Sequence, residues 1–311
     1  MTLFRTRLAP SPTGLLHLGN ARTFLVNWWM ARAAGGEVVL RIEDLDRSRV
    51  KDGFVERQIE DLEWLGLDWD EGPVTQSART DTYAAAFETL REQGRAYPCA
   101  CSRREIRAAA AAPHASDEGP SYPGTCRGRF ADEDEARVAA GRRPAWRFVV
   151  DPGEVAFDDR CRGPISLDPA VVGGDFVLRT VDEVWSYQLA VAVDDAAMGI
   201  TEVVRGDDLV SSTPRQIILL RALSLPAPRY THLPLVLDAN GERMAKRRGD
   251  TELTTLRERG VPADEVVAFL ARRSGVPDVG PRMSASDGVE RFDLATLPKE
   301  AIEITELPWA G

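Results

Sequence analysis

The sequence predicts an α/β fold built around a parallel sheet. Strand-like and helix-like patterns alternate from residue 4 to residue 97, which is the rhythm of βαβ units. Neither the strand-like nor the helix-like hydrophobic pattern is sustained between Cys99 and Gly163, so this stretch is expected to be an insertion into the sheet. A sheet-like pattern resumes at residue 175 and is followed by short helical segments.

The first half of the chain supplies two of the expected strands and three helices. The run 4–10 predicts a strand that enters a Pro/Gly loop, and the β-branched run 37–44 predicts the next strand. Apolar residues recur at helical spacing over 20–35, where Gly35 and Gly36 form a favourable stop. Amphipathic helices are expected over 54–68 and 80–97.

The second half repeats the alternation. Sheet-like patterns cover 175–195 and 200–209, and helical patterns cover 212–225, 251–260 and 262–275. Ser212 or Thr213 is expected to open the first of these helices, with Pro214 at its first position. The tail beyond Pro277 is punctuated by proline and glycine and predicts no element.

Composition narrows the class of protein. The 311 residues are 43% hydrophobic and 28% charged, and they suffice for two domains or for one domain with insertions. No apolar run approaches the ~20 residues of a bilayer span, and the N-terminus lacks a signal-peptide pattern, so a cytoplasmic protein with no membrane association is expected. The net charge of -10 opposes a general affinity for nucleic acid but permits a local basic face.

Two separate segments have the chemistry of a nucleotide site. Residues 7–23, RLAPSPTGLLHLGNART, join a strand to a helix, a place where backbone N–H groups and the helix dipole bind phosphate. His17 and Asn20 add side-chain donors, although so short a motif is more often a structural turn. The second segment is the basic stretch 243–250, in which Lys246 has the charge and length to reach a triphosphate.

Six segments resemble the class I aminoacyl-tRNA synthetases in their glutamyl form. Residues 10–23 look like the His-Ile-Gly-His-type signature, and 243–247 look like the companion Lys-Met-Ser-Lys-Ser loop. The other similar segments, in the same order as in glutamyl-tRNA synthetases, are 41–49, 187–195, 203–216 and 231–236. Asn20 replaces the second histidine of the signature and Ala245 replaces a serine, while a donor and Lys246 are retained.

This resemblance implies a class I synthetase Rossmann-like catalytic domain with a zinc-bearing insertion and a small C-terminal helical region. It implies that His17, Asn20 and Lys246 are catalytic and that, together with Gly19, they bind ATP, which Mg²⁺ would accompany. The positions implied for glutamate are Arg7, Leu8, Ala9, Pro10, Ser11, Glu43, Tyr187 and Arg205.

These side chains also suit glutamate on chemical grounds. Arg7 and Arg205 can each hold a carboxylate through two hydrogen bonds, Glu43 suits the ammonium group, and Tyr187 can donate its hydroxyl. Alone, Glu43 or Arg205 would more readily indicate a structural ion pair. The expected reaction is attack of the glutamate α-carboxylate on the α-phosphorus of ATP, which yields glutamyl-adenylate and pyrophosphate.

The cysteines of the expected insertion indicate a metal site. Cytosolic thiols stay reduced, and Cys99, Cys101 and Cys126 offer three of the four ligands of tetrahedral Zn²⁺. Residue chemistry leaves the fourth ligand open between His114, Cys161 and Tyr122, and unmetallated buried cysteines remain the alternative. The resemblance favours Tyr122, because a short glutamyl-synthetase-like family carries a Cys-x-Cys…Tyr-x₃-Cys structural zinc site.

The chain is similar to the short glutamyl-Q tRNA(Asp) synthetase family, since only about sixty residues follow Gly249 and a separate anticodon-reading domain needs more. The implied activity is ATP-dependent transfer of L-glutamate to queuosine in the anticodon arm of tRNA(Asp), by a monomer. A truncated glutamyl-tRNA synthetase and a non-catalytic binding protein are the alternatives. The expected division is catalytic halves at 1–98 and 175–249, the insertion at 99–174 and the helical region at 250–311.

Overall fold

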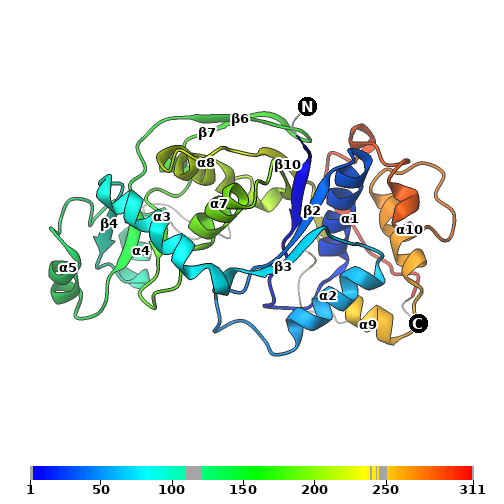
Figure 1. Ribbon diagram of the computed structural model, residues 1–311, viewed down its shortest axis with the longest axis horizontal. Helices are drawn as coiled ribbons and strands as arrows, with labels where there is room; N and C mark the ends of the chain where they lie inside the picture. The colour runs from blue at the N-terminus through cyan, green and yellow to red at the C-terminus, as the bar shows by residue number, and fades with distance from the viewer. Residues whose placement is uncertain (1–2, 110–120, 239, 243, 245–250, 310–311) are drawn as a thin grey trace.

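A computed structural model describes residues 3–109, 121–238, 240–242, 244 and 251–309, and it confirms the α/β class with parallel strands. The molecule is elongated (Figure 1). Strands β1, β2 and β10 lie near its middle, the segment that contains β4, α4 and α5 forms one end, and α10 lies at the other.

Two neighbouring groups of strands, parallel except for the β6–β7 hairpin, make up the central sheet. The order β1-β2-β3 forms one group and β7-β6-β10-β9 the other, and β10 pairs in parallel with both β6 and β9. Thr201 N donates to Arg5 O at 2.8 Å, which joins the start of β9 to β1. The strands are β1 (Arg5–Leu8), β2 (Glu37–Ile42), β3 (Glu71–Thr75), β6 (Val155–Asp159), β7 (Gly163–Leu167), β9 (Glu202–Gly206) and β10 (Arg229–Leu233).

Helices pack on this sheet through apolar faces. The helix α1 buries eleven of its side chains, Trp29 among them, between the sheet and α10. The main helices are α1 (Leu18–Ala33), α2 (Phe54–Trp64), α3 (Thr80–Glu92), α7 (Tyr187–Ala197), α8 (Ser212–Ala222), α9 (Leu253–Glu258) and α10 (Ala263–Arg273). None of the helices within the described part of the chain is long and apolar enough for a bilayer span.

A separate antiparallel sheet, in the order β4-β5-β8, forms around the expected insertion at 99–174. Strand β4 (Ala96–Cys99) leads into the insertion and β8 (Val177–Arg179) follows it. Within it lie α4 (Arg103–Ala109), α5 (Glu133–Ala140), β5 (Ala145–Phe148) and α6 (Pro169–Val172). The β6–β7 hairpin comes from the same stretch of sequence but pairs with β10 of the central sheet. This hairpin therefore brings Asp159, at the end of β6, next to the strands that carry the candidate site.

Three local expectations were wrong. Residues 187–195 form the helix α7 rather than a strand, because a short, fully buried apolar run looks alike in both conformations. The strand β3 was missed because Gly72 and Pro73 indicate a turn and its first three residues are exposed. The helix α8 begins at Ser212 after an N-cap at Ser211, so Pro214 occupies the third helical position.

A short parallel pair lies beside the candidate site. The strand β11 (Val236–Leu237) pairs with β12 (Ile302–Glu303), and Ile302 N donates to Leu235 O at 2.9 Å. Met244 N in turn donates to Val236 O at 3.0 Å. The segment at residues 302–303 thus supports the strand from which the basic loop starts.

Candidate active site

A cleft of about 1300 Å³ opens at the carboxyl ends of β1, β9 and β10 and at the N-terminus of α1. This is where α/β proteins with parallel strands usually bind ligands. Residues from both halves of the sequence line it together: Arg7, Ala9, His17, Gly19, Asn20, Glu43, Tyr187 and Arg205. All eight were predicted as site residues from the sequence.

The other predicted residues lie differently. The Leu8 side chain is fully buried in the hydrophobic core, and Pro10 accepts a hydrogen bond from Glu43 N through its carbonyl at 2.9 Å. Ser11 lines a neighbouring cleft. Lys246 lies outside the described residues, but Met244 and Thr251 on either side of it both line the main cleft.

His17 and Asn20 form a capping box at the start of α1. His17 Nδ1 accepts from the backbone N–H of Gly19 at 3.1 Å, and Asn20 Oδ1 accepts from His17 N at 3.2 Å. These contacts fix the neutral imidazole as the tautomer that carries its proton on Nε2. They also leave Asn20 with its side-chain N–H groups as donors, next to the positive end of the α1 dipole. The local environment is therefore suited to phosphate oxygens.

A buried chain of charges connects Arg7 to Glu43. Asp195 Oδ1 accepts from Arg7 Nε at 3.1 Å and from Arg41 Nη1 at 2.6 Å, and Arg41 Nη2 donates to Glu43 Oε1 at 3.0 Å. Burial alone would raise the pKa of Asp195, but Arg7 and Arg41 hold that pKa below its usual value. Burial raises the pKa of Glu43, although Arg41 and Arg7 oppose the rise. The four groups position one cation and one carboxylate side by side in the cleft.

Arg205 is buried on β9 and tightly held. All five of its N–H donors have an acceptor: His232 Nε2 at 3.1 Å, Gln216 Oε1 at 2.8 Å, Thr213 Oγ1 at 2.8 Å, Leu209 O at 3.3 Å and Tyr187 Oη at 3.4 Å. The contacts to Leu209 and Tyr187 are the long ones. They are the contacts that a carboxylate entering the cleft would replace, while the three shorter ones keep the guanidinium in place.

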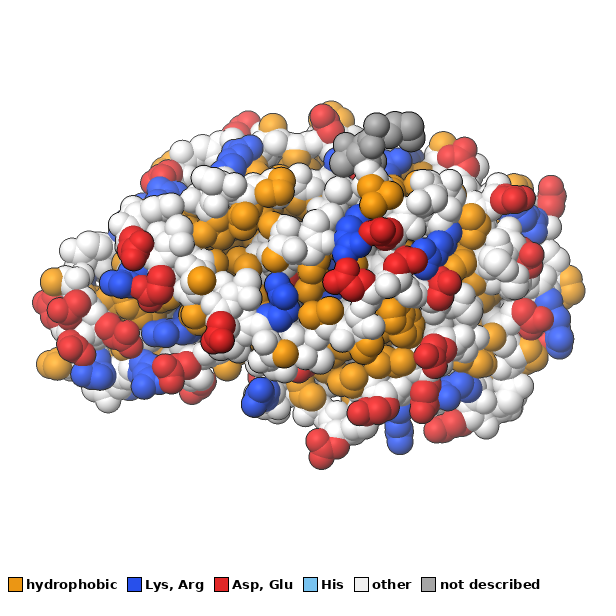
Figure 2. Space-filling model, in the orientation of Figure 1, with side chains coloured by type: hydrophobic (Ala, Val, Ile, Leu, Met, Phe, Trp, Pro, Cys, Tyr) orange, Lys and Arg blue, Asp and Glu red, His pale blue; other side chains and the backbone are white. Residues whose placement is uncertain are grey.

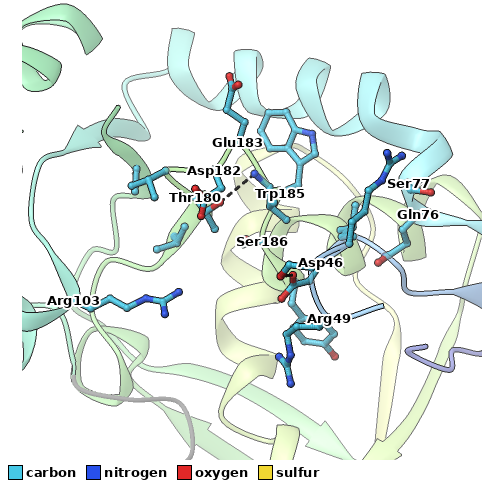
Figure 3. Close-up of a pocket in the computed structure, with 18 of the residues that line it drawn as sticks. Asp46, Arg49, Gln76, Ser77, Arg103, Thr180, Asp182, Glu183, Trp185 and Ser186 are labelled. Atoms are coloured by element: carbon cyan, nitrogen blue, oxygen red, sulfur yellow. Dashed lines mark hydrogen bonds between the residues drawn. The ribbon is translucent and has the colours of Figure 1, made fainter. Parts of the chain in front are cut away.

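A second cleft of about 1090 Å³ adjoins the first and shares Glu43, Arg49 and Tyr187 with it. Hydroxyl, charged and apolar side chains line it, and Arg103 extends into it from α4 (Figure 3). Trp185 also lines it, beside the helix α3. Basic and acidic side chains are interspersed over the face seen in Figure 2, and the described lining of this cleft likewise combines five arginines with four carboxylates.

The three predicted cysteine ligands lie together at the insertion. The sulfur atoms of Cys99, Cys101 and Cys126 lie within 4.8 Å of one another, and those of Cys101 and Cys126 are 3.4 Å apart. Tyr122 Oη lies 3.3 Å from Cys99 Sγ and 3.6 Å from Cys101 Sγ. Tetrahedral zinc, with Zn–S bonds near 2.3 Å, requires ligand separations of about 3.8 Å. The donor set of three sulfurs and one phenol oxygen therefore fits zinc.

Cys161, one alternative fourth ligand, lies apart from this cluster: it packs in the main hydrophobic core and its carbonyl accepts from Lys299 Nζ at 3.3 Å. His114, the other alternative, lies outside the described residues. Arg147 contacts this cluster: its Nε donates to Cys99 Sγ at 3.3 Å and its guanidinium lies 3.8 Å from the centre of the Tyr122 ring. Burial raises the pKa of Cys101 to about 12. A free thiol at this position is thus protonated, and metal binding would release its proton.

Sequence reasoning missed the residues that hold the predicted ones. Arg41 and Asp195 link Arg7 to Glu43, and His232 contacts Arg205. The available signals were weak. Arg41 and Glu43 are two residues apart on a strand, so they share a face, and His232 is one of only three histidines.

Comparisons with known proteins agree with this geometry. The family described as tRNA synthetases class I (E and Q), catalytic domain, matches residues 4–307. The glutamyl-Q tRNA(Asp) synthetase of Symbiobacterium thermophilum is 48% identical over 96% of this chain and 95% of its own length. The chain belongs to the class I tRNA synthetase (E and Q) family. The resemblance predicted from the motifs is confirmed.

The glutamate–tRNA ligases are similar to this chain over only part of their own length. The glutamate–tRNA ligase of Synechococcus sp. is 42% identical over 96% of this chain, which corresponds to 62% of its own length. The crystal structure of a glutamate tRNA ligase from Elizabethkingia meningosepticum, in complex with its amino acid, superposes with a TM-score of 0.80 at 28% identity. That match covers 97% of this chain and 67% of the ligase. The class I synthetase catalytic fold is thereby confirmed.

Proposed function

We propose that this protein activates L-glutamate with ATP and transfers it to queuosine in the anticodon arm of tRNA(Asp). The observation that carries the proposal is 48% identity to a glutamyl-Q tRNA(Asp) synthetase over 95% of that relative's length. The glutamate–tRNA ligase of Synechococcus sp. is less similar, at 42% identity, which favours the glutamyl-Q activity. We further propose that the protein acts as a monomer in the cytoplasm.

Glutamate binds in the main cleft on this proposal. Arg7 and Arg205 hold its two carboxylates, Glu43 holds the ammonium group, and Tyr187 donates its hydroxyl. The spacing of these groups is supported by the Arg7–Asp195–Arg41–Glu43 chain, which places a cation and an anion next to each other. Such a paired arrangement suits a zwitterion, because each charge of the amino acid meets its opposite.

ATP binds beside it, against the start of α1. An oxygen of the glutamate α-carboxylate attacks the α-phosphorus, and the bond to the β-phosphate oxygen breaks, so pyrophosphate leaves with its negative charge. His17 and Asn20 donate to the reacting phosphates, and Lys246 neutralises the pyrophosphate. Mg²⁺ supplies further charge neutralisation when it accompanies ATP. The protein's contribution is positioning and electrostatic stabilisation rather than covalent catalysis.

The acceptor reaches the adenylate through the second cleft. A hydroxyl of the queuosine cyclopentenediol attacks the glutamyl carbonyl and gives up its proton to the departing phosphate, the bond from the carbonyl carbon to the phosphate oxygen breaks, AMP leaves, and an ester forms. The two clefts meet at Glu43, Arg49 and Tyr187, so an acceptor in one lies beside glutamate in the other. Arg49 and Arg103 offer charge for the RNA backbone, and the neighbouring hydroxyl groups offer hydrogen bonds.

Zinc on this proposal is structural and is held by Cys99, Cys101, Tyr122 and Cys126. A Cys₃Tyr set leaves no open position for a reacting water, so the ion supplies rigidity rather than catalysis. Arg147 offsets the negative charge that three thiolates leave on the site after zinc is bound. The metal thus fixes β4 and the loop before α5 at one wall of the second cleft.

The decisive experiment is transfer of labelled glutamate to purified tRNA(Asp), with and without queuosine. We expect label only on the queuosine-containing tRNA, and we expect it to persist after the 3′-terminal adenosine has been removed. Labelling of unmodified tRNA(Glu), lost with the terminal adenosine, would instead identify a glutamate–tRNA ligase. Absence of glutamate-dependent ATP–pyrophosphate exchange, measured with and without tRNA, would identify a non-catalytic binding protein.

A further inference from the structure

His232 lies behind Arg205, outside the set of residues that line the clefts. It sits on β10 with no exposed surface, directly opposite Arg205 in the parallel pairing of β10 with β9. On its other side, β6 pairs with β10 and ends at Asp159, which is also buried. Asp159 is in register with Tyr230, two positions before His232, and its side chain reaches His232, so Asp159, His232 and Arg205 follow one another across three adjacent strands, with Arg205 lining the cleft.

The hydrogen bonds of Asp159 fix the proton of the imidazole. Asp159 Oδ2 lies 2.7 Å from His232 Nδ1, and Oδ1 accepts from the backbone N–H groups of Cys161 at 3.0 Å and Arg162 at 2.8 Å. An ionised carboxylate only accepts, so Nδ1 of His232 must carry a hydrogen. The hydrogen bond from His232 keeps the pKa of Asp159 low even though burial opposes this, so the carboxyl group is ionised at neutral pH.

The other ring nitrogen must then be an acceptor. His232 Nε2 lies 3.1 Å from Arg205 Nε, which is always a donor, and 3.1 Å from Thr213 Oγ1. A proton on Nε2 would point at the Nε–H of Arg205 and, because Nδ1 already carries a hydrogen, would place a charged imidazolium against the guanidinium. Burial and Arg205 accordingly lower the pKa of His232, against the opposing effect of Asp159. The imidazole is therefore neutral, with its hydrogen on Nδ1.

We propose that His232 is a positioning residue for glutamate: it accepts the Nε–H of Arg205 and so directs the two terminal nitrogens of that guanidinium toward the substrate carboxylate. Asp159 sets the tautomer that makes this possible. The inference rests on the proposed function, because it requires Arg205 to bind a carboxylate of glutamate. Neither His232 nor Asp159 touches substrate.

The reason for this arrangement is geometric. Two short contacts, to Gln216 and Thr213, restrain one side of each terminal nitrogen of Arg205. Without an acceptor at Nε, the guanidinium keeps a buried donor unsatisfied, and rotation about its last bonds would relieve this. Such a rotation would misdirect the fork that binds a carboxylate bidentately. Loss of the acceptor is thus expected to weaken glutamate binding without affecting ATP.

Two matched substitutions separate the two ends of the imidazole. In His232→Gln, the side-chain oxygen can occupy the position of Nε2 and accept from Arg205. In His232→Asn, the shorter amide can occupy the position of Nδ1 and donate to Asp159, but no acceptor reaches Arg205. We expect the glutamate KM in ATP–pyrophosphate exchange to rise about tenfold to a hundredfold in His232→Asn and to stay within about threefold of wild type in His232→Gln. The ATP KM should be unchanged in both.

A spectroscopic measurement tests the tautomer without any activity. The chain contains three histidines, so the imidazole ¹⁵N signals of His232 are assigned by comparison with His232→Gln. We expect a protonated Nδ1 and an unprotonated Nε2 at pH 7. A proton on Nε2 would overturn the inference. So would equal glutamate KM values in His232→Gln and His232→Asn, provided that the two variants unfold at the same midpoint. Failure of wild type to catalyse exchange would instead refute the proposed function, while the tautomer test still applies.

Discussion

Replacing Asp195 with asparagine perturbs the charge balance on which the proposed glutamate site depends. The side chains of Arg41, Asp195 and Arg7 are 0%, 4% and 5% exposed, and Asp195 Oδ1 contacts both guanidinium groups. Together with Glu43 they form two cations and two anions, so the buried cluster is neutral. The substitution keeps the shape of the side chain but leaves one positive charge in excess.

The loss of stability in Asp195→Asn can be estimated from the distances between the charges. Unit charges about 4 Å apart attract by about 4 kcal/mol at an effective dielectric constant of 20, and Asp195 makes two such contacts. Part of this gain already offsets the desolvation of the ions, so removal of one partner is expected to destabilise the fold by about 3–5 kcal/mol. That is a large fraction of the ~5–15 kcal/mol by which domains are usually stable.

Urea unfolding at pH 7 measures this cost. Asp151→Asn is the matched control, because Asp151 pairs with Arg95 at 2.5 Å but is 64% exposed, so its loss should cost less than about 1 kcal/mol. We also expect a higher glutamate KM in Asp195→Asn, since Arg7 loses an anchor. If the free energy of unfolding of Asp195→Asn lay within 1 kcal/mol of the control, the charge-balance reasoning would be refuted.

Two further substitutions test the metal site and a buried acid. Tyr122→Phe should weaken zinc binding at least tenfold in chelator competition, whereas Tyr97→Phe, which loses only a contact to Asp175, should not; equal affinities would exclude Tyr122 as a ligand. Burial raises the pKa of Asp61 to about 6 despite its hydrogen bond from Thr254. The folded state then binds the extra proton between the unfolded value of 3.8 and 6, so stability falls by up to about 3 kcal/mol as pH rises through this window. In Asp61→Asn the free energy of unfolding should no longer show this fall with pH. If the free energies of unfolding of Asp61→Asn and wild type differed by the same amount at every pH, the prediction would be wrong.

Local signals in the sequence were sufficient for the first part of the site. The loop before α1, the start of that helix and its stop at Gly35 are encoded by neighbouring residues, so they were predictable. The capping box of His17 and Asn20 is also local. The positions of Glu43 and Arg205 followed from resemblance, because a strand pattern does not reveal which polar residue faces a ligand.

Tertiary partners were beyond reach of the sequence. Asp195 was placed on an expected strand, where its side chain would have alternated with Asp194, but both carboxylates are buried on the helix α7. They serve separate networks: Asp195 contacts Arg7 and Arg41, and Asp194 accepts from Tyr83 and Gln76. The pairing of His232 with Asp159 depends on strand register across 73 positions of sequence, which no local pattern encodes.

The pairing of β12 with β11 has a consequence for inhibition. The strand β11 leads into the segment that carries Lys246, and its edge is covered by residues 302–303 rather than by the cleft wall. A small molecule or peptide that displaced Ile302 would therefore contact the base of that segment from outside the cleft. Its effect on turnover would not diminish as ATP or glutamate is raised, because it would compete with neither. A search for noncompetitive inhibitors should thus target the strand β12, which lies far along the chain from the signature segment at residues 10–23.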